Sequence, residues 1–167
     1  NGVGKNIQIT GGNVTVKSGT GVWIGGTNGE ISKDSLTGAV TYVNQNGNVE
    51  NTANWDIMVN GTAVNGVNYK DILSDGALCY DIEEKTLKLK DGKSFEGALT
   101  ITAPEDVSID LEADASHVVE GDLTVNGAKD VKVTKLGGGA AAAIQGKAEI
   151  TCSGDVILEN WGGSRGD

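Results

Sequence analysis

The sequence has little proline, little aromatic content and few basic residues. Of its 167 residues one is proline and 4% are aromatic, while 13 Lys and Arg stand against 23 Asp and Glu, which gives a net charge of −10. Nucleic acid needs a basic binding face, so we expect no nucleic-acid partner. An anionic membrane surface is disfavoured for the same reason. No apolar run approaches transmembrane length, so we expect no membrane insertion.

Residues for metal or nucleophilic chemistry are also scarce. The chain has two cysteines, Cys79 and Cys152, and one histidine, His117. No CxxC or Cys/His spacing occurs, which argues against a zinc site. The cysteines either form one disulfide or pack as two small apolar residues. No Gly-x-Ser-x-Gly motif accompanies His117, so a structural or surface histidine is favoured over a catalytic triad.

The chain is rich in glycine, with 26 residues, and it contains an internal repeat. A Gly precedes a strand-like segment at three positions that are 24 and 25 residues apart. In each unit apolar residues alternate twice, and an Asp-Val pair opens the second alternating segment. The three units are Gly97–Ile109, Gly121–Val133 and Gly146–Leu158, and a weaker copy covers Ile7–Val16.

This repeat predicts an all-β fold, a short parallel, right-handed β-helix or β-solenoid with coils of about 24 residues. The unit is too short for a βαβ crossover, and a β-sandwich with regular hairpins is the alternative. The Gly fits a backbone position with unusual φ, and the Asp fits a corner where it bonds its own backbone. Two inward ladders are expected: Leu99, Leu123 and Ala148 in one, and Val107, Val131 and Val156 in the other.

Three segments are expected along the chain, joined as one continuous structural unit. Residues 1–54 are interpreted as solenoid coil, the tail of a preceding module, plus a loop. Residues 55–96 are a β insert or cap, with hairpin signals at Asn60-Gly61 and around Glu83–Lys85. Residues 97–167 are solenoid coils. Both termini are interpreted as cuts in a longer protein.

Four segments have a further pattern in common with known proteins: Trp55–Val64, Asp71–Asp81, Thr86–Leu89 and Gly121–Gly127. Together they resemble the carbohydrate-binding or adhesin-like β-helix repeat module of gut Firmicutes surface proteins. That module has a V-x-V-x-G strand, a G-D-G-x-x-x-Y-D turn, a T-L-x-L strand and coils of the G-D-L-T-V-x-G type. In this chain Ser74 replaces the first Gly of the turn, and Cys79 stands where Ser is common.

The resemblance implies where such a chain works and with what. It implies an extracellular or cell-surface location on a bacterium, and neighbouring modules of the same chain as partners. It implies a polysaccharide or host glycan as the candidate ligand, and it brings no catalytic residues.

Two sets of side chains are candidates for binding. Asp110, Glu112 and Asp114 alternate with apolar residues, so a strand would place all three carboxylates on one face. They either bind Ca²⁺ through hard oxygen ligands or form a solvated acidic edge. Trp161, in a Gly-rich turn, and Trp23, in a strand, are the candidates for stacking on a sugar ring.

These observations predict a non-catalytic surface-protein module, serving as a structural spacer, as a glycan- or host-binding adhesin-like segment, or as both. The alternative is a β-helix carbohydrate-active enzyme, a lyase or a glycosidase. A glycosidase needs two carboxylates across a cleft, which the many acidic residues allow. The scarcity of aromatic residues and the single arginine, Arg165, argue against either enzyme. We assign no catalytic residue, and no cofactor other than the candidate Ca²⁺.

Overall fold

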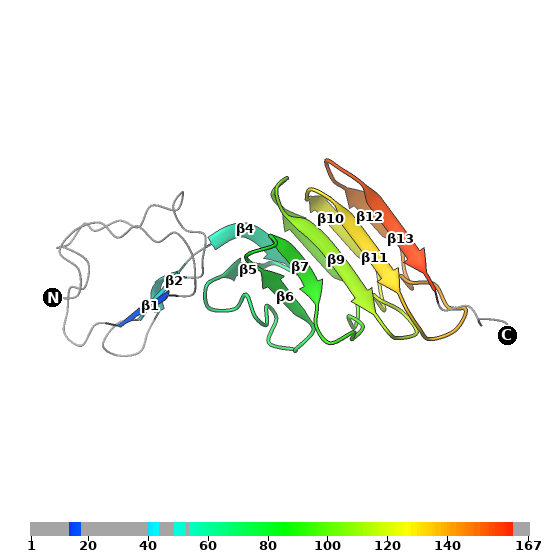
Figure 1. Ribbon diagram of the computed structural model, residues 1–167, viewed down its shortest axis with the longest axis horizontal. Helices are drawn as coiled ribbons and strands as arrows, with labels where there is room; N and C mark the ends of the chain where they lie inside the picture. The colour runs from blue at the N-terminus through cyan, green and yellow to red at the C-terminus, as the bar shows by residue number, and fades with distance from the viewer. Residues whose placement is uncertain (1–13, 18–39, 44–48, 53, 162–167) are drawn as a thin grey trace. The chain divides into compact units, whose positions relative to one another are not determined.

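The computed structural model describes residues 14–17, 40–43, 49–52 and 54–161, with side chains from residue 54 onward. These residues form thirteen β-strands and no helix, which confirms the all-β prediction (Figure 1). Among them, no helix is long and apolar enough to cross a membrane. The chain divides into two compact units, Asn1–Trp55 with Asn65–Val67, and Asp56–Val64 with Asn68–Asp167.

The first unit contains a three-stranded sheet. Its order is β1 (Val14–Lys17), β2 (Val40–Val43) and β3 (Val49–Thr52). β1 pairs with β2 in parallel, and β2 pairs with β3 antiparallel across an irregularity between Tyr42 and Val43. β1 lies in the weak N-terminal copy of the repeat, most of which is outside the described residues.

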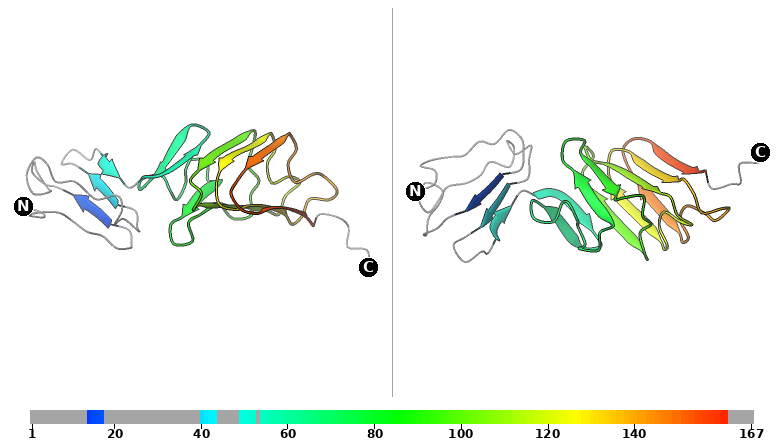
Figure 2. Two further views of the ribbon diagram at one scale, coloured as in Figure 1. Left: turned by 90° about the horizontal axis from the view of Figure 1, so that it is seen from above. Right: turned by 60° about the horizontal axis from the view of Figure 1, so that its bottom comes forward.

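The second unit is the β-solenoid. Two five-stranded sheets form two sides of its coils (Figure 2). The first sheet has the order β12 (Ala148–Thr151), β10 (Leu123–Gly127), β8 (Leu99–Ala103), β4 (Asn54–Val59) and β5 (Thr62–Asn65). The second has the order β13 (Val156–Asn160), β11 (Val131–Lys135), β9 (Ser108–Ala113), β7 (Thr86–Leu89) and β6 (Leu78–Asp81).

The coils stack in parallel around one apolar interior. β8, β10 and β12 pair in parallel, as do β7, β9, β11 and β13. A third side is closed by single parallel bridges from Phe95 to Val119 and from Val119 to Ile144. Alternate side chains of β8 and β9 are buried, as the period-2 pattern predicts. The result is a solenoid of about three turns with coils of roughly 24 residues, which confirms the predicted fold class.

One of the two predicted ladders has the wrong register. Leu123 pairs with Leu99 and with Ala148, as expected. Val131 pairs with Val156 but, in the preceding coil, with Ile109 rather than Val107. The corner that begins at Pro104 is longer than the corresponding corner before β11, because the chain makes an extra turn there, in which Val107 N donates to Pro104 O at 3.1 Å. Val107 is nevertheless buried.

The repeated glycines matter mainly because they let the coils stack closely, and only one of the three has an unusual φ. Gly97 has a φ of +81°, as predicted. Gly121 has an ordinary φ, yet a Cβ there would lie 2.5 Å from the carbonyl carbon of Gly97. Gly146 meets the backbone of Gly121 in the same way, at 2.8 Å. The prediction of unusual φ was therefore right for the first repeat and wrong for the other two, where the absence of a side chain lets coils approach.

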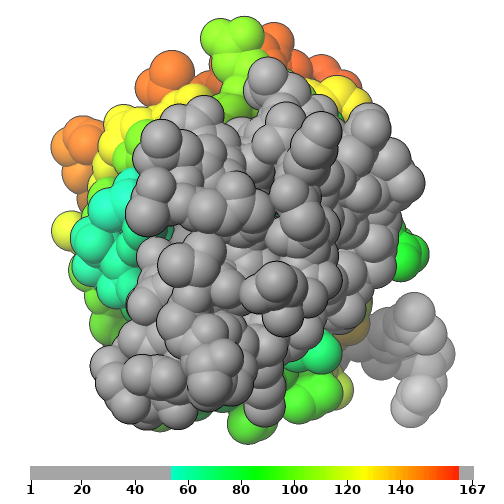
Figure 3. Space-filling view, turned by 90° about the vertical axis from the view of Figure 1, so that its left-hand side faces the viewer, coloured from blue at the N-terminus to red at the C-terminus, as the bar shows by residue number. Residues whose placement is uncertain are grey.

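Two hairpins precede the first complete coil. β4 and β5 flank the turn Asn60-Gly61, where φ is +47° and +78°, the signature of a type I′ turn. The Asn60 side chain accepts a hydrogen bond from Thr100 N at 2.7 Å and donates one to Ala98 O at 3.1 Å, which ties the turn to β8. β6 and β7 pair antiparallel. Both hairpin predictions are confirmed. On the face of the molecule that Figure 3 shows, atoms of these hairpins and of the later coils are visible.

Candidate functional site

Trp161 follows directly on β13 and points into solvent. Its side chain is 62% exposed, and its backbone N donates to Lys135 O at 2.8 Å. The side chain is therefore free to stack while its backbone is held. Glycan binding by Trp161 stays a prediction, and Trp23 lies outside the described residues. Trp55, in β4, is half-buried.

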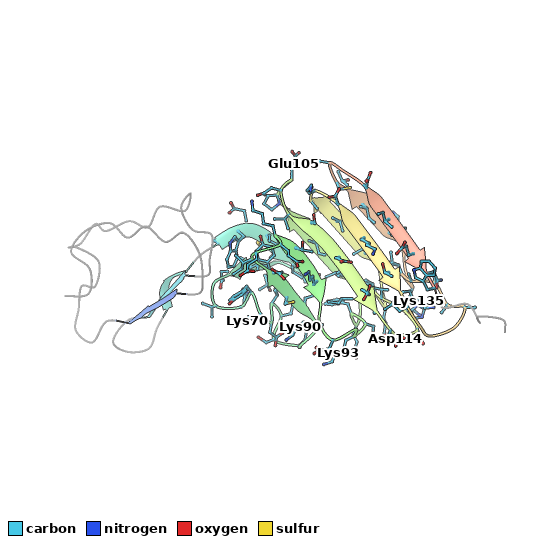
Figure 4. All side chains as sticks on the ribbon, in the orientation of Figure 1. Lys70, Lys90, Lys93, Glu105, Asp114 and Lys135 are labelled. Atoms are coloured by element: carbon cyan, nitrogen blue, oxygen red, sulfur yellow. The ribbon has the colours of Figure 1, made fainter. Side chains whose placement is uncertain are left out.

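The three carboxylates of the acidic segment do not share one site. β9 alternates as predicted, with Asp110 and Glu112 on the outer face. Asp114 lies beyond the end of β9, at the lower edge of the coils in Figure 4. In the register of the sheet, Asp110 lies between Lys88 and Lys132, so its nearest strand partners are cationic.

The lysines beside Asp110 bind other carboxylates. Lys88 Nζ pairs with Glu84 and, at 3.3 Å, with Asp81. Hydrogen bonds from the backbone N–H of Glu84 and from Lys88 lower the pKa of Asp81, the backbone bond most. Lys132 Nζ lies 3.7 Å from Glu159 Oε2. Asp110 Oδ1 is buried without a hydrogen-bond partner.

The calcium site that the sequence suggested would have two lysines beside it. Within the described residues, no three His, Cys, Asp or Glu side chains come together to hold a metal ion. The lysines flanking Asp110 would compete with a cation. Calcium binding stays a prediction, to be checked by melting.

A fully buried lysine is the least expected side chain of the solenoid. Lys135 ends β11 and occupies the inward position that follows Val131 and Val133. Its Nζ donates to Gly139 O at 2.5 Å and to Asn160 Oδ1 at 3.3 Å. Lys135 thereby fastens the Gly- and Ala-rich loop that follows it to the end of β13. The sequence signal was a Lys at the third inward position of an alternating strand.

Two aspartates join one coil to the next. Asp122 Oδ1 accepts from Lys147 N at 2.7 Å, and Asp130 Oδ1 accepts from Asp155 N at 3.0 Å. The Asp before each Val was expected to bond its own backbone, but Asp130 bonds the backbone of the following coil. Asp122, for which the sequence predicted no such role, does the same. The parallel stacking of the coils explains these contacts, because it brings a backbone N–H of the following coil within hydrogen-bonding distance of the carboxylate. Asp155 holds in the last coil the position that Asp130 holds in the one before.

The remaining candidate residues are the single histidine and the two cysteines. His117 Nδ1 lies 2.7 Å from Ala142 O, in the loop after β11. Cys79 and Cys152 are both free and half-buried, so the disulfide alternative is not what the structure contains. Burial is the main cause that raises the pKa of the Cys79 thiol.

The C-terminal coil is the part of the described solenoid with the most exposed apolar surface. Four large apolar side chains are exposed there: Val156, Ile157, Leu158 and Trp161. For Val156 and Leu158, the register partners in the preceding coil, Val131 and Val133, are buried. Comparison of the chain with protein-family models, with curated proteins and with solved structures found no match. The site is therefore defined by geometry alone, as the last described coil with an exposed tryptophan beside it.

Proposed function

We propose that the chain is a non-catalytic structural module of an extracellular bacterial surface protein, in which the solenoid acts as a stiff spacer. The observation that supports this most is the stack of coils in register around one apolar interior, which reaches from the hairpins before β8 to β13. In such a stack many parallel hydrogen bonds share any bending force, and neighbouring coils stabilise each other.

Connections between coils support stiffness further. Besides the two sheets and the Phe95–Val119–Ile144 bridges, Asp122 and Asp130 each bind the backbone of the next coil. Bending or sliding one coil against another would break several of these bonds together. A spacer needs this resistance more than it needs a pocket.

Stiffness can be measured as a distance distribution. Spin labels at the exposed residues Glu83, between β6 and β7, and Ser153, between β12 and β13, would span the solenoid. Both native cysteines are first replaced by serine. We expect one narrow distance distribution, because the labelled turns belong to one stack. A broad or bimodal distribution would contradict the spacer proposal.

Glycan binding is the second function that a specific observation favours. Trp161 presents an exposed indole beside Asn160 and Glu159, and aromatic faces with polar neighbours suit sugar rings. A glycan array with the intact chain tests this. Loss of the signal in Trp161→Ala, but not in the matched Ile157→Ala on the outer face of β13, would place the ligand at Trp161.

The same preparation tests the enzyme alternative. Incubation with acidic and neutral polysaccharides, followed by assays for reducing ends and for unsaturated products, detects a glycosidase or a lyase. We expect no product, and turnover of either kind would replace the spacer proposal.

A further inference from the structure

The outer face of the first sheet carries a small, regular array of polar side chains, called the threonine face below. The array has two positions on each of β8, β10 and β12, in register from strand to strand: Thr100 and Thr102, Thr124 and Asn126, and Glu149 and Thr151. All six are exposed except Thr124, which is half-buried. The inward residues between them on β8 and β10 are buried, so these two strands are held firmly from inside.

The hydroxyl groups of the threonine face have no partner within the described part of the chain. There, the side chains of its four threonines and of Asn126 make no hydrogen bond. The outer face of the second sheet differs, because Thr86 Oγ1 donates to Glu84 O at 3.0 Å and Thr134 Oγ1 donates to Glu159 Oε2 at 3.3 Å. The threonine face therefore presents free hydrogen-bond donors and acceptors to solvent.

Charge is nearly absent from the threonine face, although the chain has a net charge of −10. Its one carboxylate, Glu149, forms an ion pair with Lys147. On the outer face of the second sheet, by contrast, Asp110 lies between Lys88 and Lys132 in register. A strongly acidic chain repels anionic polymers. An uncharged ligand is therefore the one that the threonine face complements.

The spacing of the side chains indicates the shape of such a ligand. Neighbouring strands of a sheet lie about 4.8 Å apart. Each of the two rows of the threonine face therefore has one side chain about every 4.8 Å across the strands. An extended β-1,4-linked polysaccharide repeats its pyranose unit at a similar interval, so one sugar unit would lie over each strand.

We propose that the threonine face binds an uncharged, extended β-1,4-linked polysaccharide that lies across β8, β10 and β12. The Thr and Asn side chains donate hydrogen bonds to sugar hydroxyls and accept hydrogen bonds from them. Met58, which is 38% exposed and pairs in register with Thr102, adds an apolar contact for the C–H groups of a ring. The proposal rests on the glycan-binding function above, but it names the class of glycan and places it on a different surface from Trp161.

The expected affinity is low. A hydrogen bond that replaces one to water contributes little net free energy, and the threonine face contains no aromatic side chain. A few such bonds correspond to a dissociation constant on the order of 1 mM. Removal of one hydroxyl should weaken binding about fivefold.

Titration of the isotope-labelled full chain with cellohexaose, followed by amide NMR spectra, tests the proposal. We expect shifts that saturate at millimolar concentration and that are largest for residues of β8 and β10. Maltohexaose, whose α-1,4 linkages coil the chain, and the acidic hexagalacturonate should cause no such shifts. Equal binding of hexagalacturonate would contradict an uncharged ligand.

The double variant Thr102→Val/Thr124→Val removes two hydroxyls and keeps the β-branched shape that suits a strand. We expect its affinity for cellohexaose to fall about 25-fold. Thr134→Val, the same change on the outer face of the second sheet, is the matched control and should bind as the native chain does. Circular dichroism melts verify that both are folded, and the single variant Thr102→Val replaces the double variant if that does not fold.

Two results would overturn the proposal. One is the absence of shifts with cellohexaose, and the other is unchanged affinity in the folded threonine variants. Shifts that surround Trp161 and disappear in Trp161→Ala, but persist in the threonine variants, would place the glycan at Trp161 alone. In that case glycan binding stands and the threonine face is not its site.

Discussion

At the scale of single residues, the buried lysine shows how the solenoid secures a loop. Lys135 places a cation in an apolar interior, where it is stabilised by the oxygens of Gly139 and Asn160. Burying a charge is costly unless hydrogen bonds satisfy it. The gain is that the connection between β11 and β12, residues 136–147, is held near the coil.

Substitution of Lys135 separates its packing from its charge. Lys135→Met keeps the stem, so we expect global stability to change by less than about 2 kcal/mol while amides of the following loop exchange faster. Lys135→Ala also loses packing and should cost about 2–4 kcal/mol in a urea melt. Lys132→Met, on the outer face, is the control with little effect. An unchanged melt for Lys135→Ala would contradict this.

The buried Tyr80 predicts that the folded protein loses stability at alkaline pH. Burial, with smaller contributions from Asp106 and Asp81, raises the pKa of Tyr80 from 10.0 to about 12. Between these values the folded state keeps a proton that the unfolded state releases. Stability is therefore complete below pH 10 and falls as pH rises toward 12, by up to about 3 kcal/mol.

Urea melts at several alkaline pH values check this for the native chain and for Tyr80→Phe. The variant should show a shallower fall of stability with pH. Some slope will remain, because the hydrogen bond to Glu84 raises the pKa of Lys88 as well. Equal slopes for the two proteins would show that Tyr80 ionises normally in the folded state.

Calcium binding is tested by melting temperature. Because Asp110 lies between two lysines in register, we expect the same melting temperature in millimolar Ca²⁺ and in chelator. A rise with Ca²⁺ that Asp110→Asn removes would restore the calcium site predicted from the acidic segment.

At the scale of elements, the interface between coils depends on a glycine ladder. Any Cβ on Gly121 must displace the Gly97 backbone, whereas a Cβ on Gly97 meets no atom within 4 Å and only strains a φ of +81°. We expect Gly121→Ala to cost about 2–3 kcal/mol and Gly97→Ala about 1 kcal/mol in urea melts. Equal losses of stability in the two variants would mean that the contact between Gly121 and Gly97 does not limit the spacing of the coils.

At the scale of the whole molecule, the described solenoid is asymmetric, with hairpins at one end and an open coil at the other. In dilute, monomeric protein we expect amide exchange to be slowest in β8 to β11 and fastest from residue 148 to 160. The reason is that the last coil has neighbours on one side only. Hydrogen exchange followed by mass spectrometry measures this. Strong protection of β12 and β13 in a demonstrated monomer would contradict an open end.

The sequence by itself determined the fold class and much of its detail. Alternation of apolar residues and the 24- and 25-residue steps predicted the stacked strands, because side-chain direction in a strand depends on local periodicity alone. Asn60-Gly61 predicted a turn for the same reason, since positive φ is a local preference. The outer-face position of Asp110 and the exposure of Trp161 also followed from the pattern.

Only the tertiary structure decided those contacts across coils that depend on the length and conformation of the corners. The shift that pairs Val131 with Ile109, the lysines beside Asp110 and the bonds from Asp122 and Asp130 all depend on corner lengths. Corner conformation is set by how the coils pack, since a short turn has several backbone conformations of similar energy. Whether Val156 and Leu158 are buried depends, in turn, on what lies against β13, and periodicity within a strand contains no information about that.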